Sequence, residues 1–461
     1  MSALDILALG MATDPGNIGG NWNQSTSALK NQFERALAQA QPLQARPWKA
    51  ALDYTVGEAI KQGMVRNSSG KLYEALNSGT CITAPTTLVT AVESGGTLNW
   101  AYAGIALSPP ADQEETPTVD LAQGSTVPSG LTAWPTYNNR ARLALMGCYP
   151  TEYAGSGRLR LYSFSSNASS PMAHGSSRFF CDAPIIAAEV TSGTSGMAIN
   201  VNSRPLIPGT LSPLPATNDF TKITWGSRRP RLYEIFAHRG AGNIGLLGLT
   251  AADRIWPAPP PINLRMGWIG DSYDEGSGYG PMVPGRRLCQ LVGRRLGIYD
   301  VWSWSKGGTG LINQGVGSAF YTYIQRIPEI AARSPHLWII QGSTNDSGYS
   351  AAQIKAAAKA LIAAIRAVSS APIVWVGPVY LASVANIATI DDAISDGVAE
   401  MAAGGTANVW YYSMYDDLVW DANNLSLQVA GDAVHAFAAS HDNLAERISA
   451  YIINTVYPGI Q

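Results

Sequence analysis

Two kinds of hydrophobic pattern divide this chain of 461 residues. Between about residues 126 and 256, apolar and polar positions alternate in short segments such as RARLALMG and AINVNS. Alternation with a period of two is typical of strands with one buried face, so we expect an all-β sandwich of the jelly-roll kind. From Met266 onward, short apolar runs alternate with helical stretches, which predicts a three-layer α/β domain with a parallel sheet.

Two further patterns lie before the predicted sandwich. Leu29, Phe33 and Leu37 have helical spacing behind Ser and Thr residues, which predicts an amphipathic helix. An isolated helix needs a partner, either the next domain or copies of itself, and we interpret it as an attachment or oligomerisation segment. After it, short strand-like pieces separated by Gly, Asn and Ser predict a small β module.

A stretch rich in Pro, Glu and Thr, typical of a linker, separates this module from the sandwich. The length suits about three domains. The predicted parts are a helical attachment or oligomerisation segment (1–45), a small aromatic-rich β module (46–106), a linker (107–125), a β-sandwich accessory domain (126–256) and an α/β domain (257–461).

Composition narrows the function classes. Charged residues make up 14% of the chain and the formal net charge is -2, so nucleic acid and anionic membrane surfaces are not expected partners. No stretch reaches the roughly 18 apolar residues of a membrane span, and the first residues do not predict a signal peptide. The cysteines lack close C-x-x-C spacing, which favours free, buried thiols. They are Cys81, Cys148, Cys181 and Cys289.

Polar residues cluster where the predicted parallel strands end. In such sheets ligands bind outside the carboxyl ends of the strands, so we expect these loops to meet at one edge. The loops are Gly270-Asp271-Ser272, Lys306-Gly307-Gly308-Thr309-Gly310, Gly342-Ser343-Thr344-Asn345-Asp346 and Asp432-Ala433-Val434-His435.

A serine in such a loop becomes a nucleophile only if a base can take its proton, and histidine suits that role near neutral pH. His435 is the preferred base for Ser272, because Asp432, three positions earlier, can hold its imidazole in the productive tautomer. His441, at the start of the last predicted helix, is the rival. The other three histidines fall in the β region or at the start of a strand, and they are His174, His238 and His336.

Taken together, the four loops resemble the SGNH (GDSL-type) hydrolase family in order, in position after strands and in residue type. The resemblance covers about the last 200 residues. It implies a serine esterase with Ser272, Asp432 and His435 as catalytic triad, and with Ser272, Gly308 and Asn345 as donors of the oxyanion hole. The implied mechanism needs neither a cofactor nor a metal.

A β-sandwich directly before such a domain is similar to the two-domain carbohydrate esterases and to polysaccharide deacetylases of phage tail fibres and tailspikes. This resemblance implies removal of O-acetyl (acyl) groups from an acetylated polysaccharide such as bacterial capsule or O-antigen. It also implies a location in the phage virion or outside the cell, as a homo-oligomer (trimer) attached to the phage particle. Trp48, Tyr54 and Trp100 of the small module then bind sugar, or they form the module's own core.

Two other functions stay open. A non-catalytic glycan-binding adhesin with an esterase-like fold is disfavoured because a binding site has no use for all five catalytic positions. A lipase or thioesterase of the same superfamily is disfavoured by the polar segment DSYDEGSGYG around Ser272. The absence of a G-x-S-x-G elbow at this serine argues against the α/β-hydrolase fold.

Overall fold

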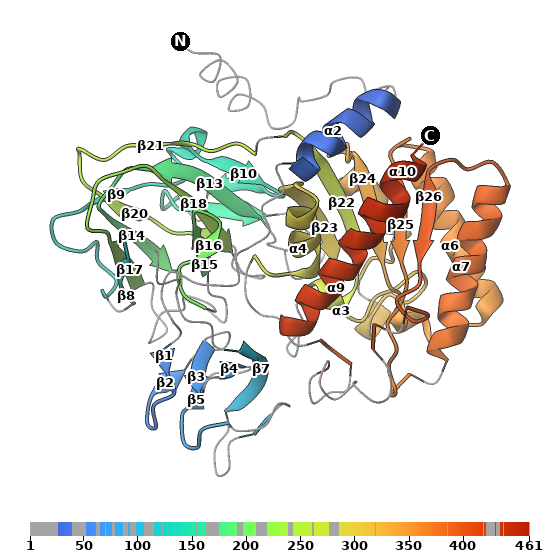
Figure 1. Ribbon diagram of the computed structural model, residues 1–461, viewed down its shortest axis with the longest axis horizontal. Coiled ribbons are helices and arrows are strands. Elements are labelled where there is room, and N and C mark those ends of the chain that lie inside the picture. Colours follow the sequence, from blue (N-terminus) through green and yellow to red (C-terminus); the bar gives the residue numbers. More distant parts are fainter. Residues whose placement is uncertain are drawn as a thin grey trace.

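The computed structural model describes most of the chain between Thr26 and Ile460. The described residues are 26–38, 52–60, 65–69, 71–75, 79–85, 91–92, 98–105, 115–121, 123–152, 155–162, 175–190, 197–208, 219–237, 243–260, 262–275, 285–318, 320–384, 386–417, 419–420, 429, 434–436 and 438–460. Figure 1 shows a β-rich half and an α/β half side by side, with the small N-terminal β module below the β-rich half.

The α/β half is built on a five-stranded sheet with the order β23-β22-β24-β25-β26. All neighbouring strands pair in parallel, as the short apolar runs predicted. The three central strands are buried on both sides, because helices cover both faces of the sheet. The strands are β22 (Arg265–Gly270), β23 (Asp300–Ser305), β24 (Leu337–Gln341), β25 (Ile373–Val376) and β26 (Val409–Tyr412).

Side chains on the two faces of this sheet enter two separate cores. Met266 and Ile339 pack with Leu291 and Leu444 on one face, whereas Ile269 and neighbouring strand residues pack with the helices of the other face. The domain therefore has three layers, as predicted (Figure 1). The first face carries α4 (Leu288–Arg295) and α9 (Ala438–Tyr451), and the second carries α5 (Ile327–Ala331), α6 (Ala351–Arg366) and α7 (Ile387–Ala403).

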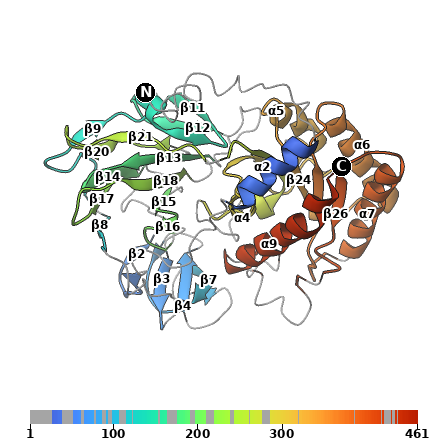
Figure 2. The ribbon, with the colours of Figure 1, turned by 45° about the horizontal axis from the view of Figure 1, so that its top comes forward.

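The N-terminal helix α2 (Thr26–Ala38) packs on this α/β domain (Figure 2). Phe33 and Ala36 are buried in the same core as α4 and α9. The chain approaches so closely that a Cβ on Gly297 would lie 2.0 Å from the carbonyl oxygen of Ala36. The apolar face of α2 is therefore covered by the α/β domain of the same chain, which is one of the two partners expected for it. Attachment or oligomerisation through this segment stays a prediction.

The predicted sandwich consists of antiparallel sheets around a common core. One sheet has the order β10-β13-β18-β15-β16 with β21 beside β13, and another has the order β8-β17-β14-β20-β9. Phe179, Ile199, Ile223 and Leu247 from both sheets lie in one buried cluster, and the jelly-roll connectivity stays a prediction. The strands are β8 (Thr118–Asp120), β9 (Thr132–Trp134), β10 (Ala144–Met146), β13 (Ser176–Cys181), β14 (Ile185–Val190), β15 (Met197–Val201), β16 (Arg204–Pro205), β17 (Asp219–Thr224), β18 (Arg231–Ala237), β20 (Leu247–Leu249) and β21 (Ile255–Pro257).

One predicted boundary needs correction. We expected residues 107–125 to be a linker, but β8 (Thr118–Asp120) pairs antiparallel with β17 as a strand of the sandwich. Glu115, just before it, binds the guanidinium of the buried Arg231, with 2.7 Å between the charged atoms. The sandwich therefore includes the chain from Glu115 onward. Thr118 and Val119 favour a strand, although the Pro-rich composition around them is typical of a linker.

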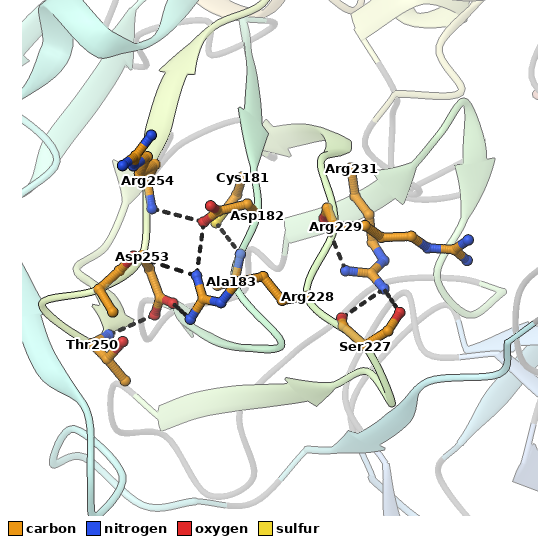
Figure 3. Close-up of polar contacts among 11 residues, drawn as sticks. Cys181, Asp182, Ala183, Ser227, Arg228, Arg229, Arg231, Thr250, Asp253 and Arg254 are labelled. Atoms are coloured by element: carbon orange, nitrogen blue, oxygen red, sulfur yellow. Dashed lines mark hydrogen bonds and ion pairs between the residues drawn. The ribbon is translucent and has the colours of Figure 1, made fainter.

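Several arginines of the sandwich form ion pairs within this domain. Arg228 bridges Asp182 and Asp253 at 3.2 and 2.6 Å (Figure 3), and the guanidinium of Arg231 lies over the Trp225 ring. The Arg231 guanidinium is buried and would be costly without partners, so its contacts have a structural role.

The sandwich and the α/β domain are joined by a buried ionic cluster. Glu234 of β18 is fully buried and binds Arg178 of β13 at 2.9 Å and Arg294 of α4 at 2.8 Å. Both guanidiniums lie over the ring of Tyr299 in the α/β domain. Because removing one member would leave a charge buried without its counterion, this cluster fixes the two domains against each other.

The small module contains a sheet with the order β1-β3-β4-β7-β6 and a separate pair β2-β5. The strands of the module are β1 (Leu52–Asp53), β2 (Ala59–Ile60), β3 (Val65–Ser68), β4 (Lys71–Ala75), β5 (Gly79–Thr80), β6 (Ala91–Val92) and β7 (Asn99–Ile105).

Two expectations from composition concern the whole chain. All four cysteines are free and buried, as expected. Among the described residues, the helices are too short or too polar to span a bilayer.

Candidate active site

Ser272 lies at the carboxyl edge of the central strand β22, as the first residue of the short helix α3 (Ser272–Glu275). The strand ends at Gly270, where a Cβ would lie 2.8 Å from the Gln341 side chain and 2.9 Å from the Ser305 hydroxyl. Because the first N–H groups of a helix have no intrahelical acceptor, the Ser272 N–H is available for other partners. The residue is only 8% exposed, so attack by its hydroxyl would occur largely shielded from water.

The loop after β23 lies against this serine. A Cβ on Gly307 would lie 2.7 Å from a carboxylate oxygen of Glu275 and 3.3 Å from Cβ of Ser272, so a larger residue would require these neighbours to shift. Gly308 follows with a φ of 75°, a left-handed conformation that glycine adopts without steric cost. Gly308, the predicted oxyanion glycine, is therefore the next residue after the glycine that lies against Ser272, the predicted nucleophile.

Asn345 reaches the same loop from the end of β24. It lies in a single 3₁₀ turn (Thr344–Asp346), and its Nδ2 donates a hydrogen bond to the carbonyl oxygen of Thr309 at 2.9 Å. A side-chain amide carries two N–H donors. One of them therefore orients the Asn345 amide on the loop, and the other is available for an oxyanion.

The loop that carries His435 contacts α3 through Tyr273, the neighbour of the nucleophile. The Tyr273 hydroxyl donates a hydrogen bond to the carbonyl oxygen of Val434 at 2.5 Å, and the Tyr273 and His435 rings lie 5.9 Å apart between centroids. Val429 and Ala436 form an isolated antiparallel bridge that closes this loop. Residues separated by more than 160 positions are therefore adjacent at the sheet edge.

Two predicted site residues, Asp432 and Trp48, lie outside the described residues. Of the other two aromatic candidates of the small module, Trp100 is fully buried and Tyr54 packs against it with ring centroids 5.8 Å apart. The prediction that Trp100 binds sugar is wrong, because a module of this size uses its large aromatic side chains to form its core.

Burial strongly affects Asp271, which precedes the nucleophile. Its Oδ1 accepts hydrogen bonds from the Tyr273 N–H and from Nε2 of Gln341, each at 3.1 Å. Desolvation raises the pKa of this carboxyl to about 6, although those hydrogen bonds and the nearby charge of His435 lower it. The carboxyl is thus held between strands close to the predicted base.

Two buried carboxylates on the same turn were not foreseen from the sequence. Asp274 accepts hydrogen bonds from the Ser303 and Ser305 hydroxyls and from the Cys289 N–H, which fixes α3 on the sheet. Glu275 accepts from the Gly307 N–H at 2.5 Å and from the Lys306 ammonium at 2.9 Å. The only sequence signal was the three acidic residues of the segment DSYDE, which gave no indication that they are buried.

Two further buried ionisable side chains hold the loops from behind. Asp346 accepts hydrogen bonds from three successive N–H groups, those of Leu311, Ile312 and Asn313, at 2.7 to 3.1 Å. Arg326 donates to the carbonyl oxygen of Gly270 at 2.7 Å and to the Thr309 hydroxyl. Burial lowers the pKa of Arg326 to about 10. These contacts connect the ends of β22, β23 and β24 into one rigid edge.

The remaining described histidines have structural surroundings. His336 lies at the amino end of β24, where its Nδ1 accepts a hydrogen bond from the Arg265 N–H at 3.0 Å. Burial lowers the pKa of His336 and of His441 to about 3, so both are neutral near pH 7. Among the described residues, no group of three His, Cys, Asp or Glu side chains is arranged to hold a metal ion.

Comparison with known protein families finds a match over the part of the chain that carries these loops. Residues 268–442 match the model of the GDSL-like Lipase/Acylhydrolase family. The match covers the four loops and thereby confirms the resemblance drawn from their motifs. No curated protein matches the chain.

Solved structures also resemble the chain. The salicylyl-acyltransferase SsfX3 from a tetracycline biosynthetic pathway has a TM-score of 0.51 and 14% identity, covering 69% of this chain and 96% of its own, which shows a shared fold. A family two carbohydrate esterase from Clostridium thermocellum, in complex with cellohexaose, has a TM-score of 0.49 and 18% identity, over 64% of this chain and 96% of its own. One from Cellvibrio japonicus has a TM-score of 0.49 and 15% identity, over 75% and 100%.

Proposed function

We propose that this protein is a serine esterase that removes O-acetyl groups from a polysaccharide. The proposal starts from residues 268–442, which match the GDSL-like Lipase/Acylhydrolase family. The observation that supports the proposal best is the close approach of the Gly307–Gly308 loop to Ser272. With Asn345 bonded to the next residue of that loop, a carbonyl carbon in front of the serine would have its oxygen near amide donors.

In the proposed first step, the Ser272 hydroxyl attacks the ester carbonyl while His435 accepts its proton. The negative charge that develops on the carbonyl oxygen is met by the N–H groups of Ser272 and Gly308 and by the Asn345 amide. The sugar hydroxyl then leaves with the proton from His435, and an acetyl group remains on the serine.

In the second step, water takes the place of the sugar. His435 removes a proton from the water, which attacks the acetyl-serine, and acetate leaves as Ser272 regains its proton. Asp432, assigned from the family resemblance, would stabilise the imidazolium that forms in each step. The polar segment beside Ser272 favours a small acyl group over a long apolar chain.

The arrangement of the sandwich on the α/β domain supports a polysaccharide as the substrate. The ionic cluster around Glu234 fixes the sandwich on the α/β domain, so a surface spanning both could hold an extended glycan in one orientation.

We further propose that the protein is attached to a phage particle as a homotrimer. Light scattering of the full chain and electron microscopy of particles labelled with an antibody against it test that assembly.

The test of the activity compares acetate release from acetylated bacterial polysaccharides with hydrolysis of long-chain esters. Wild type, Ser272→Ala and the surface control Glu400→Gln are measured, since Glu400 makes an exposed ion pair with Lys355 on α6 and α7. We expect Ser272→Ala to abolish acetate release and the control to retain it. Acetate release by Ser272→Ala would remove the proposed nucleophile, and preference for long chains would favour a lipase or thioesterase. Glycan binding without any hydrolysis would identify an adhesin.

A further inference from the structure

Glu275 connects the helix of the nucleophile to the loop of the oxyanion glycine. It is the last residue of α3, whose first residue is Ser272, and it is buried. One carboxylate oxygen accepts the Gly307 N–H at 2.5 Å, and the other accepts the Lys306 ammonium at 2.9 Å. The same side chain therefore holds two consecutive residues of the loop.

We propose that Glu275 is a positioning residue that sets the distance between the Ser272 hydroxyl and the Gly308 N–H during acyl transfer. This inference rests on the esterase function proposed above. It assigns Glu275 no contact with the substrate, and no proton moves to or from its carboxylate.

The loop needs such a tether because of its composition. Gly307 and Gly308 have wide conformational freedom in the absence of a Cβ, and a displacement of about 1 Å in a catalytic group can cost about 100-fold in rate. Since the Gly307 N–H is fixed by Glu275, only the two backbone dihedrals of Gly307 lie between that anchor and the peptide plane that carries the Gly308 N–H.

The other end of the tether is fixed as well. The carbonyl oxygen of Glu275 accepts a hydrogen bond from the Arg287 guanidinium at 2.5 Å, which holds the end of α3. The Glu275 and Lys306 side chains are 4% and 14% exposed, and the ammonium lies 4.6 Å from the centre of the Phe320 ring. Because breaking a buried ion pair leaves an uncompensated charge, the ion pair with Lys306 holds the Glu275 carboxylate in place against the loop.

Asp274, the preceding residue, gives a contrast within the same helix. Its carboxylate binds the Ser303 and Ser305 hydroxyls and the Cys289 N–H, which belong to β23 and α4. It therefore fixes α3 on the sheet, and among the described residues its hydrogen bonds go to β23 and α4 and not to the glycine loop. A role specific to the oxyanion loop belongs to Glu275.

The experiment compares wild type, Glu275→Gln, Glu275→Ala and the surface control Glu400→Gln. A fluorophosphonate probe with mass spectrometry counts the protein molecules whose Ser272 reacts. Steady-state hydrolysis of p-nitrophenyl acetate, divided by that count, gives kcat per active site and KM. Inhibition by phenylboronic acid, which forms a tetrahedral adduct with serine, measures binding of an oxyanion-like group.

We expect Glu275→Ala to lower kcat per active site about 100-fold with KM changed less than about twofold. Affinity for the boronic acid should fall in parallel. Glu275→Gln still accepts the Gly307 N–H but loses the ion pair, so a loss of about tenfold is expected. Glu400→Gln should match wild type. If Glu275→Ala does not fold, the isosteric Gln variant decides.

The inference is overturned if the folded Glu275 variants retain kcat per active site and boronic acid affinity within about twofold of wild type. It is equally overturned if activity falls only in proportion to the number of reactive serines, since that result indicates a role in folding alone. Wild type that neither reacts with the probe nor hydrolyses the ester would refute the esterase function, and the role of Glu275 with it.

Discussion

Replacing Asp271 with Asn is expected to stabilise the folded protein above pH 6 and to change its stability little near pH 4. The Asp271 carboxyl is fully buried. Its Oδ1 accepts two hydrogen bonds, whereas Oδ2 has no hydrogen-bond partner among the described residues. Burial therefore disfavours the ionised form and raises the pKa of the group from 3.8 to about 6.

The magnitude follows from proton linkage. Below about pH 3.8 the carboxyl is protonated in the folded and in the unfolded chain, so it makes no difference to stability. As the pH rises from there to about 6, the unfolded chain releases the proton first, and the free energy of unfolding falls. A difference of about two pH units corresponds to about 3 kcal/mol, which is the full cost above pH 6. A neutral Asn amide has no such pH-dependent cost.

The assay is urea unfolding of wild type and Asp271→Asn between pH 4 and pH 8, followed by tryptophan fluorescence. Asp391→Asn is the matched control, since burial raises the pKa of Asp391 to about 6 as well. Its carboxylate binds the Tyr411 and Ser413 hydroxyls on the neighbouring strand end. Both variants should show a flatter dependence of stability on pH, and only Asp271→Asn should also alter hydrolysis. Parallel profiles for wild type and Asp271→Asn would refute the reasoning.

Three further predictions concern other parts of the molecule. Asn345→Ala should lower kcat by about 10²- to 10³-fold with little change in KM, measured by steady-state hydrolysis, because one oxyanion donor is lost; an unchanged kcat would exclude the donor role. Glu234→Gln should lower stability by about 3–5 kcal/mol, measured by calorimetry, because the charges of Arg178 and Arg294 lose their buried counterion. Trp100→Ala should destabilise the small module by about 3–5 kcal/mol in urea unfolding, since its side chain is fully buried; loss of sugar binding in a module that stays folded would contradict this.

Local pattern was sufficient to predict the frame of the site. The period of the apolar runs predicted the parallel sheet, and the carboxyl ends of its strands predicted that Ser272, Gly308 and Asn345 lie at one edge. These predictions depend on residues close in sequence, because strand alternation and the loop after a strand are properties of short segments. The family resemblance then added roles to the positions, and that of Asp432 stays a prediction.

What the patterns could not determine was the partner of each side chain. Glu and Arg are usually exposed, so nothing local indicated that Glu275 and Arg231 are buried in ion pairs. A tryptophan such as Trp100 occurs both in cores and at ligand sites. Glu275 accepts its hydrogen bonds from residues more than 30 positions away, and Arg231 binds Glu115 across more than 100. The helix α2 likewise covers its apolar face on a domain that begins more than 200 residues later.

The division has a physical reason. Backbone sterics and the repeat of hydrophobic residues act over a few neighbouring positions. The sequence alone therefore determined the strands, their alternation with helices and the polar loops at their ends. Desolvation, ion pairing and close packing depend on every atom within several ångströms, and those atoms come from distant segments. Only the tertiary structure therefore decided that Asp271 is buried beside the nucleophile and that Glu275 holds the oxyanion loop.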